Sequence, residues 1–284
     1  MIVVTGATGN VGRPLVEKLA ALGERVTAVS RRPSAGAAGE PPQGVRGRQA
    51  DLAHPEGLRP ALEGADALFL LFAGELLAGT PRTGELLDVA RSAGVRRVVL
   101  LSSQAAGTRP DAVSHAPLWA FEDAVRRSGL DWTILRPGGF ASNAFAWAES
   151  VREERVIAAP FADVALPVVD PADIAEVAAA ALREPGHAGR TYELTGPAPV
   201  SPRGQADAIA DALGEPVRFA ELSRERARAE MLRFMPGPVA DGTLDILGEP
   251  TAAEQRVSPD VEAVLGRPPR SFAEWALGHV AAFA

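Results

Sequence analysis

The chain has 284 residues, enough for one large domain or two small ones, and no cysteine, so disulfides, thiolate nucleophiles and cysteine-ligated metals are excluded. Its formal net charge of −7 argues against a basic surface for nucleic acid. The longest apolar run, Ala67 to Ala73, is far shorter than the ~18 residues of a membrane span, and we expect no signal peptide because no basic segment precedes an apolar stretch. We therefore expect a soluble, cytoplasmic protein that binds neither nucleic acid nor membrane.

Short β-branched or apolar runs alternate with helical segments through the first half of the chain. The predicted strands are Met1–Thr5, Arg25–Ser30, Gly44–Ala50, Ala67–Phe72, Arg97–Ser102 and Trp132–Arg136. The predicted helices are Arg13–Leu22, Pro55–Glu63, Gly84–Ala93 and Leu118–Ser128. This alternation indicates right-handed βαβ crossovers and hence an α/β fold with a doubly wound, Rossmann-like parallel sheet.

The regularity falls after about Phe140. Val164–Val169 and Arg190–Leu194 are predicted as two late strands of the same sheet, with a helix at Ala172–Arg183 between them. We expect a nucleotide-binding core over residues 1–140, with late strands from about 164–195. Residues 141–163 and 196–284 would form a smaller, discontinuous lobe that binds the substrate.

Helix boundaries in this second half are marked by capping residues. N-caps followed by proline are predicted at Ser201 and Ser258, and Ser271 with Glu274 forms a capping box. The alternating charges of Glu221–Met235 predict a solvated amphipathic helix.

A glycine-rich loop, Thr5-Gly6-Ala7-Thr8-Gly9-Asn10-Val11-Gly12, follows the first strand and opens the first helix. Its glycines permit a tight turn, close approach of backbone N–H groups to a pyrophosphate, and close helix–strand packing. The helix N-terminus adds partial positive charge. The loop therefore predicts dinucleotide binding, and the alternative is a purely structural turn.

The residues at the end of the second strand indicate whether NAD or NADP(H) binds. NAD-binding folds carry a carboxylate there for the ribose 2′-hydroxyl, whereas this chain has Ser30-Arg31-Arg32-Pro33. Guanidinium groups suit a 2′-phosphate, which favours NADP(H). The alternative is that both arginines are simply solvated.

These segments, with Leu101-Ser102-Ser103, Leu135-Arg136-Pro137-Gly138 and the closing Gly266–Phe272, resemble the NmrA-like atypical short-chain dehydrogenase/reductases over essentially the whole chain. The resemblance is strongest to members of the NAD(P)H:quinone oxidoreductase type. It implies a set of cofactor-binding residues at the strand ends: Gly6, Thr8, Gly9, Asn10 and Val11 at the pyrophosphate, Arg31 and Arg32 at the 2′-phosphate, Asp51 and Leu52 along the adenine, Phe72 and Ala73 bordering the adenosine ribose and the nicotinamide side, and Ser102, Ser103 and Pro137 around the nicotinamide. It also implies that Asn143 faces the substrate.

The Tyr-x-x-x-Lys relay of typical short-chain dehydrogenases is absent, because Tyr192 and Lys18 are the only tyrosine and lysine. We therefore expect an NADPH-dependent oxidoreductase that passes hydride to a quinone or a similar conjugated planar acceptor, whose reduced form water can protonate. One alternative is a redox sensor that binds NADP(H) without turnover. Another is a non-redox tailoring enzyme acting on a specialised metabolite.

Ser103, His115 and Asn143 are the candidate catalytic residues that would orient the acceptor. His115 precedes a helix and has the pKa range of a proton donor, although a surface-loop histidine is the alternative. Trp119 and Trp147 either stack on a planar substrate or belong to the core. The histidines show no metal-ligand spacing, so no metal is expected. The expected partner is a small aromatic or quinone-like molecule, and the protein is expected to be a monomer or homodimer.

Overall fold

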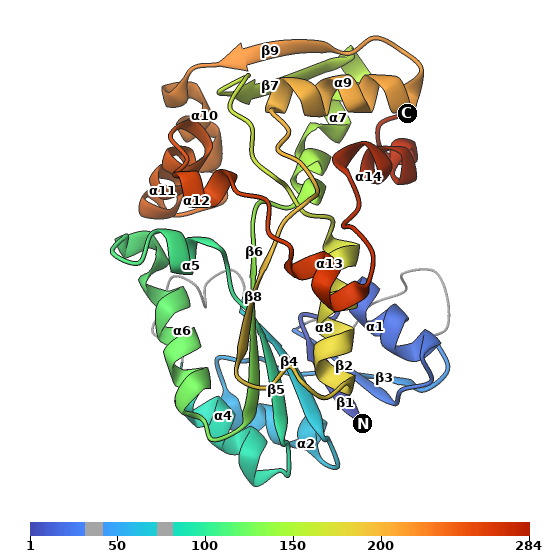
Figure 1. The fold of residues 1–284 in the computed structure, drawn as a ribbon, viewed down its shortest axis with the longest axis vertical. Helices are drawn as coiled ribbons and strands as arrows, with labels where there is room; N and C mark the ends of the chain where they lie inside the picture. The colour runs from blue at the N-terminus through green and yellow to red at the C-terminus, as the bar shows by residue number, and fades with distance from the viewer. Residues whose placement is uncertain (32–41, 73–81) are drawn as a thin grey trace.

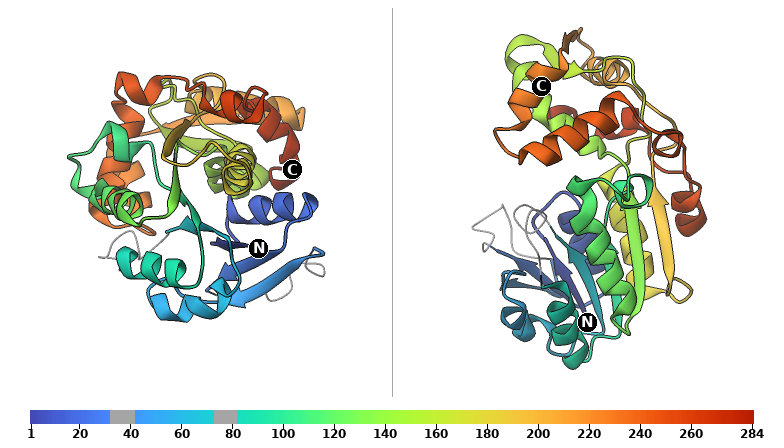
Figure 2. Two further views of the ribbon diagram at one scale, coloured as in Figure 1. Left: turned by 60° about the horizontal axis from the view of Figure 1, so that its bottom comes forward. Right: turned by 90° about the vertical axis from the view of Figure 1, so that its left-hand side faces the viewer.

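The computed structural model describes residues 1–31, 42–72 and 82–284. Figure 1 shows a lower layer built around a sheet with helices on both faces, and a smaller lobe beyond the upper end of that sheet. The views in Figure 2 show the same two-part arrangement from other sides. None of the described helices is both long enough and apolar enough to cross a bilayer.

Seven parallel strands of the described chain form the central sheet in the order β3-β2-β1-β4-β5-β6-β8. Their bounds are β1 Ile2–Thr5, β2 Val26–Ser30, β3 Val45–Gln49, β4 Ala67–Leu71, β5 Arg97–Leu101, β6 Asp131–Pro137 and β8 Arg190–Leu194. The order reverses between β1 and β4, which is the topological switch point at which ligands bind in open α/β sheets. The predicted doubly wound parallel sheet is confirmed.

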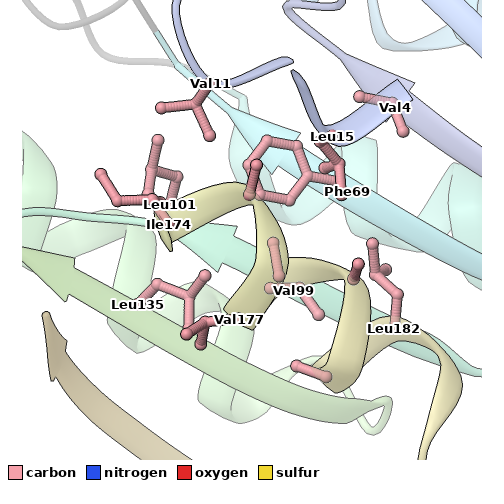
Figure 3. Close-up of a cluster of buried hydrophobic side chains, with 14 of the residues drawn as sticks. Val4, Val11, Leu15, Phe69, Val99, Leu101, Leu135, Ile174, Val177 and Leu182 are labelled. Atoms are coloured by element: carbon pink, nitrogen blue, oxygen red, sulfur yellow. The ribbon is translucent and has the colours of Figure 1, made fainter. Parts of the chain in front are cut away.

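Helices cover both faces of this sheet. On one face lie α1 Gly12–Ala21 and α8 Pro171–Arg183, and on the other lie the turn η1 Pro55–Leu58 with α2 Arg59–Leu62, α4 Thr83–Ser92 and α6 Ala116–Arg127. Strand β4 shows why its sequence is continuously apolar: Phe69 packs under α1 and α8, while Leu68 and Leu70 pack on the opposite face. Figure 3 shows Phe69 beside Leu15 and Ile174 in the first of these clusters.

The smaller lobe has its own two-stranded parallel sheet and its own core. The elements of the lobe are η3 Ala141–Trp147, α7 Ala148–Glu154, β7 Val156–Pro160, α9 Pro202–Leu213, β9 Arg218–Leu222, α10 Arg224–Met231, α11 Gly237–Gly248, α12 Ala252–Gln255, α14 Phe272–Gly278 and η4 Val280–Ala282. Its buried cluster includes Val151, Ile157, Ile209 and Trp275. The short α13, Asp260–Leu265, packs back on α8 of the core.

The prediction of a strand at Val164–Val169 is wrong. Only isolated bridges form there, Phe140 with Val169 and Leu166 with Val200, and β8 alone follows β6 in the sheet. Pro167 interrupts the segment and lacks the N–H that a strand interior needs.

The extent predicted for the amphipathic helix, Glu221–Met235, is too long at both ends, because α10 ends at Met231. Glu221 and Leu222 belong to β9, and α10 begins at Arg224 with the Ser223 hydroxyl accepting a hydrogen bond from the Arg226 N–H. Strands β7 and β9 were not predicted, because their short runs carry no alternation strong enough to separate them from neighbouring helices.

The predicted caps of α9 and α14 are confirmed. The Ser201 hydroxyl accepts a hydrogen bond from the Gly204 N–H, and the capping box of Ser271 and Glu274 is complete. At α13 the N-cap is Pro259, one residue later than predicted, and the Ser258 hydroxyl accepts from the Asp260 N–H.

Candidate functional site

The glycine loop forms a backbone cradle at the N-terminus of α1. Gly6 has a φ of +64°, and a Cβ at Gly12 would lie 2.1 Å from the Gly6 carbonyl oxygen, so both positions require glycine. No side chain caps α1, and Thr8, Gly9 and Asn10 are exposed. Open N–H groups at an uncapped helix start fit the pyrophosphate of a dinucleotide.

Thr5 marks the point at which β1 and β4 separate. Its buried hydroxyl donates to the Phe69 carbonyl and accepts from the Leu71 N–H, both at 3.0 Å. The side chain thus replaces backbone pairing beyond Val4 and Phe69, where the strand register ends. The two strands therefore separate directly beside the glycine loop, at the switch point where ligands bind in this class of sheet.

The end of β2 presents Arg31 to solvent. The Arg31 carbonyl accepts a hydrogen bond from the Gln49 side chain at 3.0 Å, which ties the ends of β2 and β3 together. Arg32, the second predicted 2′-phosphate residue, lies outside the described residues. Asp51 and Leu52, predicted along the adenine, follow β3 and are both half-buried.

The side chains that follow β4 and β5 differ in how far they are buried. The Phe72 ring is buried and stacks on Phe121 of α6 with centroids 4.1 Å apart, so its ring serves the core. Ala73 lies outside the described residues. Ser102 and Ser103 are half-buried at the end of β5, and the Ser103 hydroxyl accepts from the Ala105 N–H at 3.3 Å.

Backbone hydrogen bonds hold the end of β5 alongside the end of β6. The Ser102 N–H donates to the Leu135 carbonyl and the Gln104 N–H to the Pro137 carbonyl, each at 2.8 Å. The predicted nicotinamide residues Ser102, Ser103 and Pro137 therefore share one short edge of the sheet.

A buried charge lies behind Ser102. The Glu122 carboxylate, fully buried on α6, accepts from the Ser102 hydroxyl at 2.7 Å, from Arg126 at 2.8 Å and from Arg136 at 2.9 and 2.7 Å. Burial raises the pKa of Glu122, but the hydrogen bonds from Arg136 and Ser102 outweigh it, and the pKa lies below its ordinary value. Ser102 thus donates its proton to a carboxylate that is ionised at neutral pH, which leaves the lone pairs of the Ser102 oxygen for a ligand.

His115 lies where the core meets the lobe, immediately before α6. Its Nδ1 is 3.0 Å from the Ser114 hydroxyl, and the ring is half-buried against α11. Burial, together with the nearby Arg109 charge, lowers the pKa of His115, while Glu254 acts in the opposite direction. The imidazole is therefore neutral over more of the pH range than a free histidine.

Asn143 lies in η3, and its side chain is exposed. The adjacent Ser142 is buried, and its hydroxyl accepts a hydrogen bond from the Asn10 side chain at 3.1 Å. The glycine loop and the predicted substrate segment are thus joined directly. Trp119 is half-exposed on α6, whereas Trp147 packs against the core of the lobe.

The sequence analysis did not predict Glu122 or Ser142 as residues of the site, and it assigned no role of their own to Thr5 and Arg136. The available signal was weak and consisted of Glu122 four residues before Arg126 on the apolar face of a helix.

A cavity of about 450 Å³ also lies in the described chain, between η1 and α4. None of the glycine-loop or strand-end residues lines this cavity, so we assign it no role.

The glycine cradle at a switch point defines a dinucleotide-binding protein, and comparison with known proteins gives its family. A family model described as NAD(P)H-binding matches residues 6–185, and the chain belongs to this family. The predicted resemblance is confirmed by this family model and by quinone oxidoreductase 2 of Escherichia coli, which is 29% identical over 281 residues and covers 96% of each chain. NmrA, a negative transcriptional regulator at 20% identity, shares the fold with a TM-score of 0.73.

Several relatives that align along the whole chain are named as oxidoreductases. The chain is 38% identical over 291 residues to the (4-alkanoyl-5-oxo-2,5-dihydrofuran-3-yl)methyl phosphate reductase of Streptomyces griseus subsp. griseus, covering 100% of this chain and 99% of that protein. It is 33% identical over 294 residues to the NAD(P)H azoreductase of Xenophilus azovorans, again covering 100% and 99%. The NADPH complex of the quinone oxidoreductase QOR2 from Escherichia coli superposes with a TM-score of 0.80 at 27% identity, covering 99% and 100%. The family is therefore one of NAD(P)H-dependent oxidoreductases.

Proposed function

We propose that this protein is an NADPH-dependent reductase of planar, conjugated acceptors such as quinones. The observation that carries the proposal is where the only tyrosine and the only lysine lie. Tyr192 is buried in β8 with its hydroxyl 2.9 Å from His187, and Lys18 lies on α1 with its Nζ 3.9 Å from Glu176. Neither belongs to the edge formed by Ser102 and Ser103, so the acceptor must be one that needs no tyrosine acid.

The cofactor would be held by residues of the core. The glycine loop would bind the pyrophosphate, and Arg31 with Arg32 would bind the 2′-phosphate. When bound, NADPH supplies one hydride, which a quinone takes up to become a hydroquinone anion that water protonates. Ser102 would accept a hydrogen bond from the nicotinamide end, because its proton is already donated to Glu122.

The acceptor would be oriented by Ser103, His115 and Asn143. Each offers a neutral hydrogen-bonding group, and their role would be positioning, which accounts for large rate factors when reactants are held correctly. The names of the relatives support this substrate class, since an oxo-dihydrofuran, an azo compound and a quinone are all conjugated π-systems.

The test is NADPH consumption against a panel of quinones, an azo dye and an oxo-dihydrofuran, with NADH in parallel. Turnover that favours NADPH is the expected result. NADPH binding without turnover on any acceptor would instead favour a redox sensor, and no dinucleotide affinity would favour a non-redox enzyme.

Two glycine variants provide a matched control for the cofactor site. Gly12→Ala places a methyl group against the Gly6 carbonyl and should abolish NADPH binding. Gly47→Ala in β3 meets nothing within 4 Å and should bind NADPH as the wild type does. NADPH fluorescence measures both, and equal affinities would contradict the cofactor assignment.

A further inference from the structure

Arg109 connects the core to two helices of the lobe. It follows α5, Ala105–Thr108, six residues after Ser103. Its guanidinium donates to both Glu254 carboxylate oxygens, at 2.8 and 2.9 Å, and to the Glu249 carbonyl at 2.9 Å. One side chain thus binds the C-terminal end of α11 and the first turn of α12, which lie beside α5 in Figure 1.

The Glu254 carboxylate has two further hydrogen-bond donors besides Arg109. Its carboxylate also accepts from the Thr108 hydroxyl at 2.9 Å and, as the capping-box residue of α12, from the Thr251 N–H at 2.8 Å. The Glu254 side chain is 2% exposed, and a buried carboxylate of this kind is stable only with its donors in place. The Arg109–Glu254 pair therefore determines how the α11–α12 corner meets the core.

The same helix α11 lies against the turn that carries His115. A Cβ at Gly242 would be 2.6 Å from the Ser114 hydroxyl and 3.5 Å from Cε1 of His115. Glycine in a helix interior lowers helix stability relative to alanine, and here it permits the close approach of α11 to this turn. The contact with Ser114 occupies Nδ1 of His115, which leaves Nε2 as the ring nitrogen for a ligand.

We propose that Arg109 and Glu254 are positioning residues, which hold α11 on the Ser114–His115 turn and thereby orient the His115 imidazole toward the acceptor. The inference rests on the proposed function, because it takes His115 as a group that contacts the acceptor. Arg109 itself contacts Glu254 and backbone carbonyls, and it acts only through α11.

The first measurement is the pKa of His115 by NMR titration, with its resonances assigned from His115→Gln. Arg109→Met removes a nearby positive charge and loosens α11, so the pKa of His115 should rise. Gly242→Ala changes no charge but separates α11 from the turn. The His115 imidazole then becomes more solvated, which should also raise its pKa. Gly242→Ala is therefore the variant that separates a change in the position of α11 from a change in charge.

The control variant is Arg228→Met. Its ion pair with Asp241 joins α10 to α11, and the hydrogen bonds of the Arg228 side chain to the described residues lie within the lobe. This variant should leave the pKa of His115 unchanged. If the pKa of His115 in Arg109→Met and in Gly242→Ala equals its value in Arg228→Met, the positioning role is wrong. Should Arg109→Met not fold, Gly242→Ala decides alone, because alanine favours the helix in which it stands.

The second measurement is acceptor reduction. Misplacement of a positioned group by about 1 Å costs roughly 10²-fold, so kcat should fall by about one to two orders of magnitude in Arg109→Met and Gly242→Ala. The dissociation constant of NADPH and the kcat of Arg228→Met should not change. If the wild type reduces no acceptor, the proposed function fails, whereas the NMR titration still tests how the Arg109–Glu254 pair positions α11 on the His115 turn.

Discussion

The hydroxyl of Ser102 at the end of β5 donates to the carboxylate of Glu122 across a distance of 2.7 Å, and Glu122 is itself bound by two arginines. A fully buried carboxylate with these donors stays ionised, so the direction of the Ser102 hydroxyl is fixed by charge and not by the solvent. The edge of the sheet that faces the nicotinamide in our proposal is therefore rigidly ordered before any ligand binds.

Glu122→Ala should destabilise the fold by about 3–5 kcal/mol, because it leaves the Arg136 guanidinium buried without its partner. Chemical denaturation measures the change. Asp123→Asn on the same helix removes the exposed pair with Arg127 and should cost less than about 1 kcal/mol. Equal losses of stability in the two variants would mean that the buried network stabilises the fold no more than an exposed ion pair does.

Acid should weaken the fold partly through Glu122. Its folded pKa lies below the ordinary value of 4.5, so the unfolded state binds more protons in acid. This contribution is complete above the unfolded pKa and is lost as the pH falls through the folded pKa. Urea titrations from neutral to acid pH should show a smaller loss of stability for Glu122→Gln than for the wild type. The same loss in both would exclude Glu122 as a source of the acid sensitivity.

Arg31→Asp should shift the cofactor preference toward NADH. Loss of a charge-assisted phosphate contact, ~1.5–3 kcal/mol, corresponds to about a 10- to 150-fold fall in the NADPH-to-NADH preference. Dissociation constants for both nucleotides measure the ratio. Arg218→Asp in β9 makes the same charge change in the lobe and should leave the ratio unaltered. An unaltered ratio for Arg31→Asp would show that this side chain is only solvated.

Asn10 and Ser142 should behave as a coupled pair. Their hydrogen bond joins the glycine loop to the segment of Asn143, and such a bond contributes about 0.5–1.5 kcal/mol. Asn10→Ala and Ser142→Ala should each weaken NADPH binding about 2- to 10-fold, and the double variant should be no worse than either single one. Additive losses would indicate that the loop and η3 bind independently.

The sequence predicted the core because its signals are local. The apolar run of β4, the loop from Gly6 to Gly12 and the capping box at Ser271 each specify their structure within a few neighbouring residues. The parallel sheet follows from the alternation of such segments. The strand predicted at Val164–Val169 is absent for a reason that is also local: Pro167 interrupts the run, and only isolated bridges form there.

Tertiary structure alone decided the polar contacts of the site. Ser102 and Glu122 are separated by 20 positions, Asn10 and Ser142 by 132, and Arg109 and Glu254 by 145. No local pattern pairs residues so far apart, because their meeting depends on which helix crosses over which strand end and where the lobe docks. Buried charges such as Glu122 and Glu254 look like ordinary surface carboxylates in a sequence, and only the fold shows that their donors surround them.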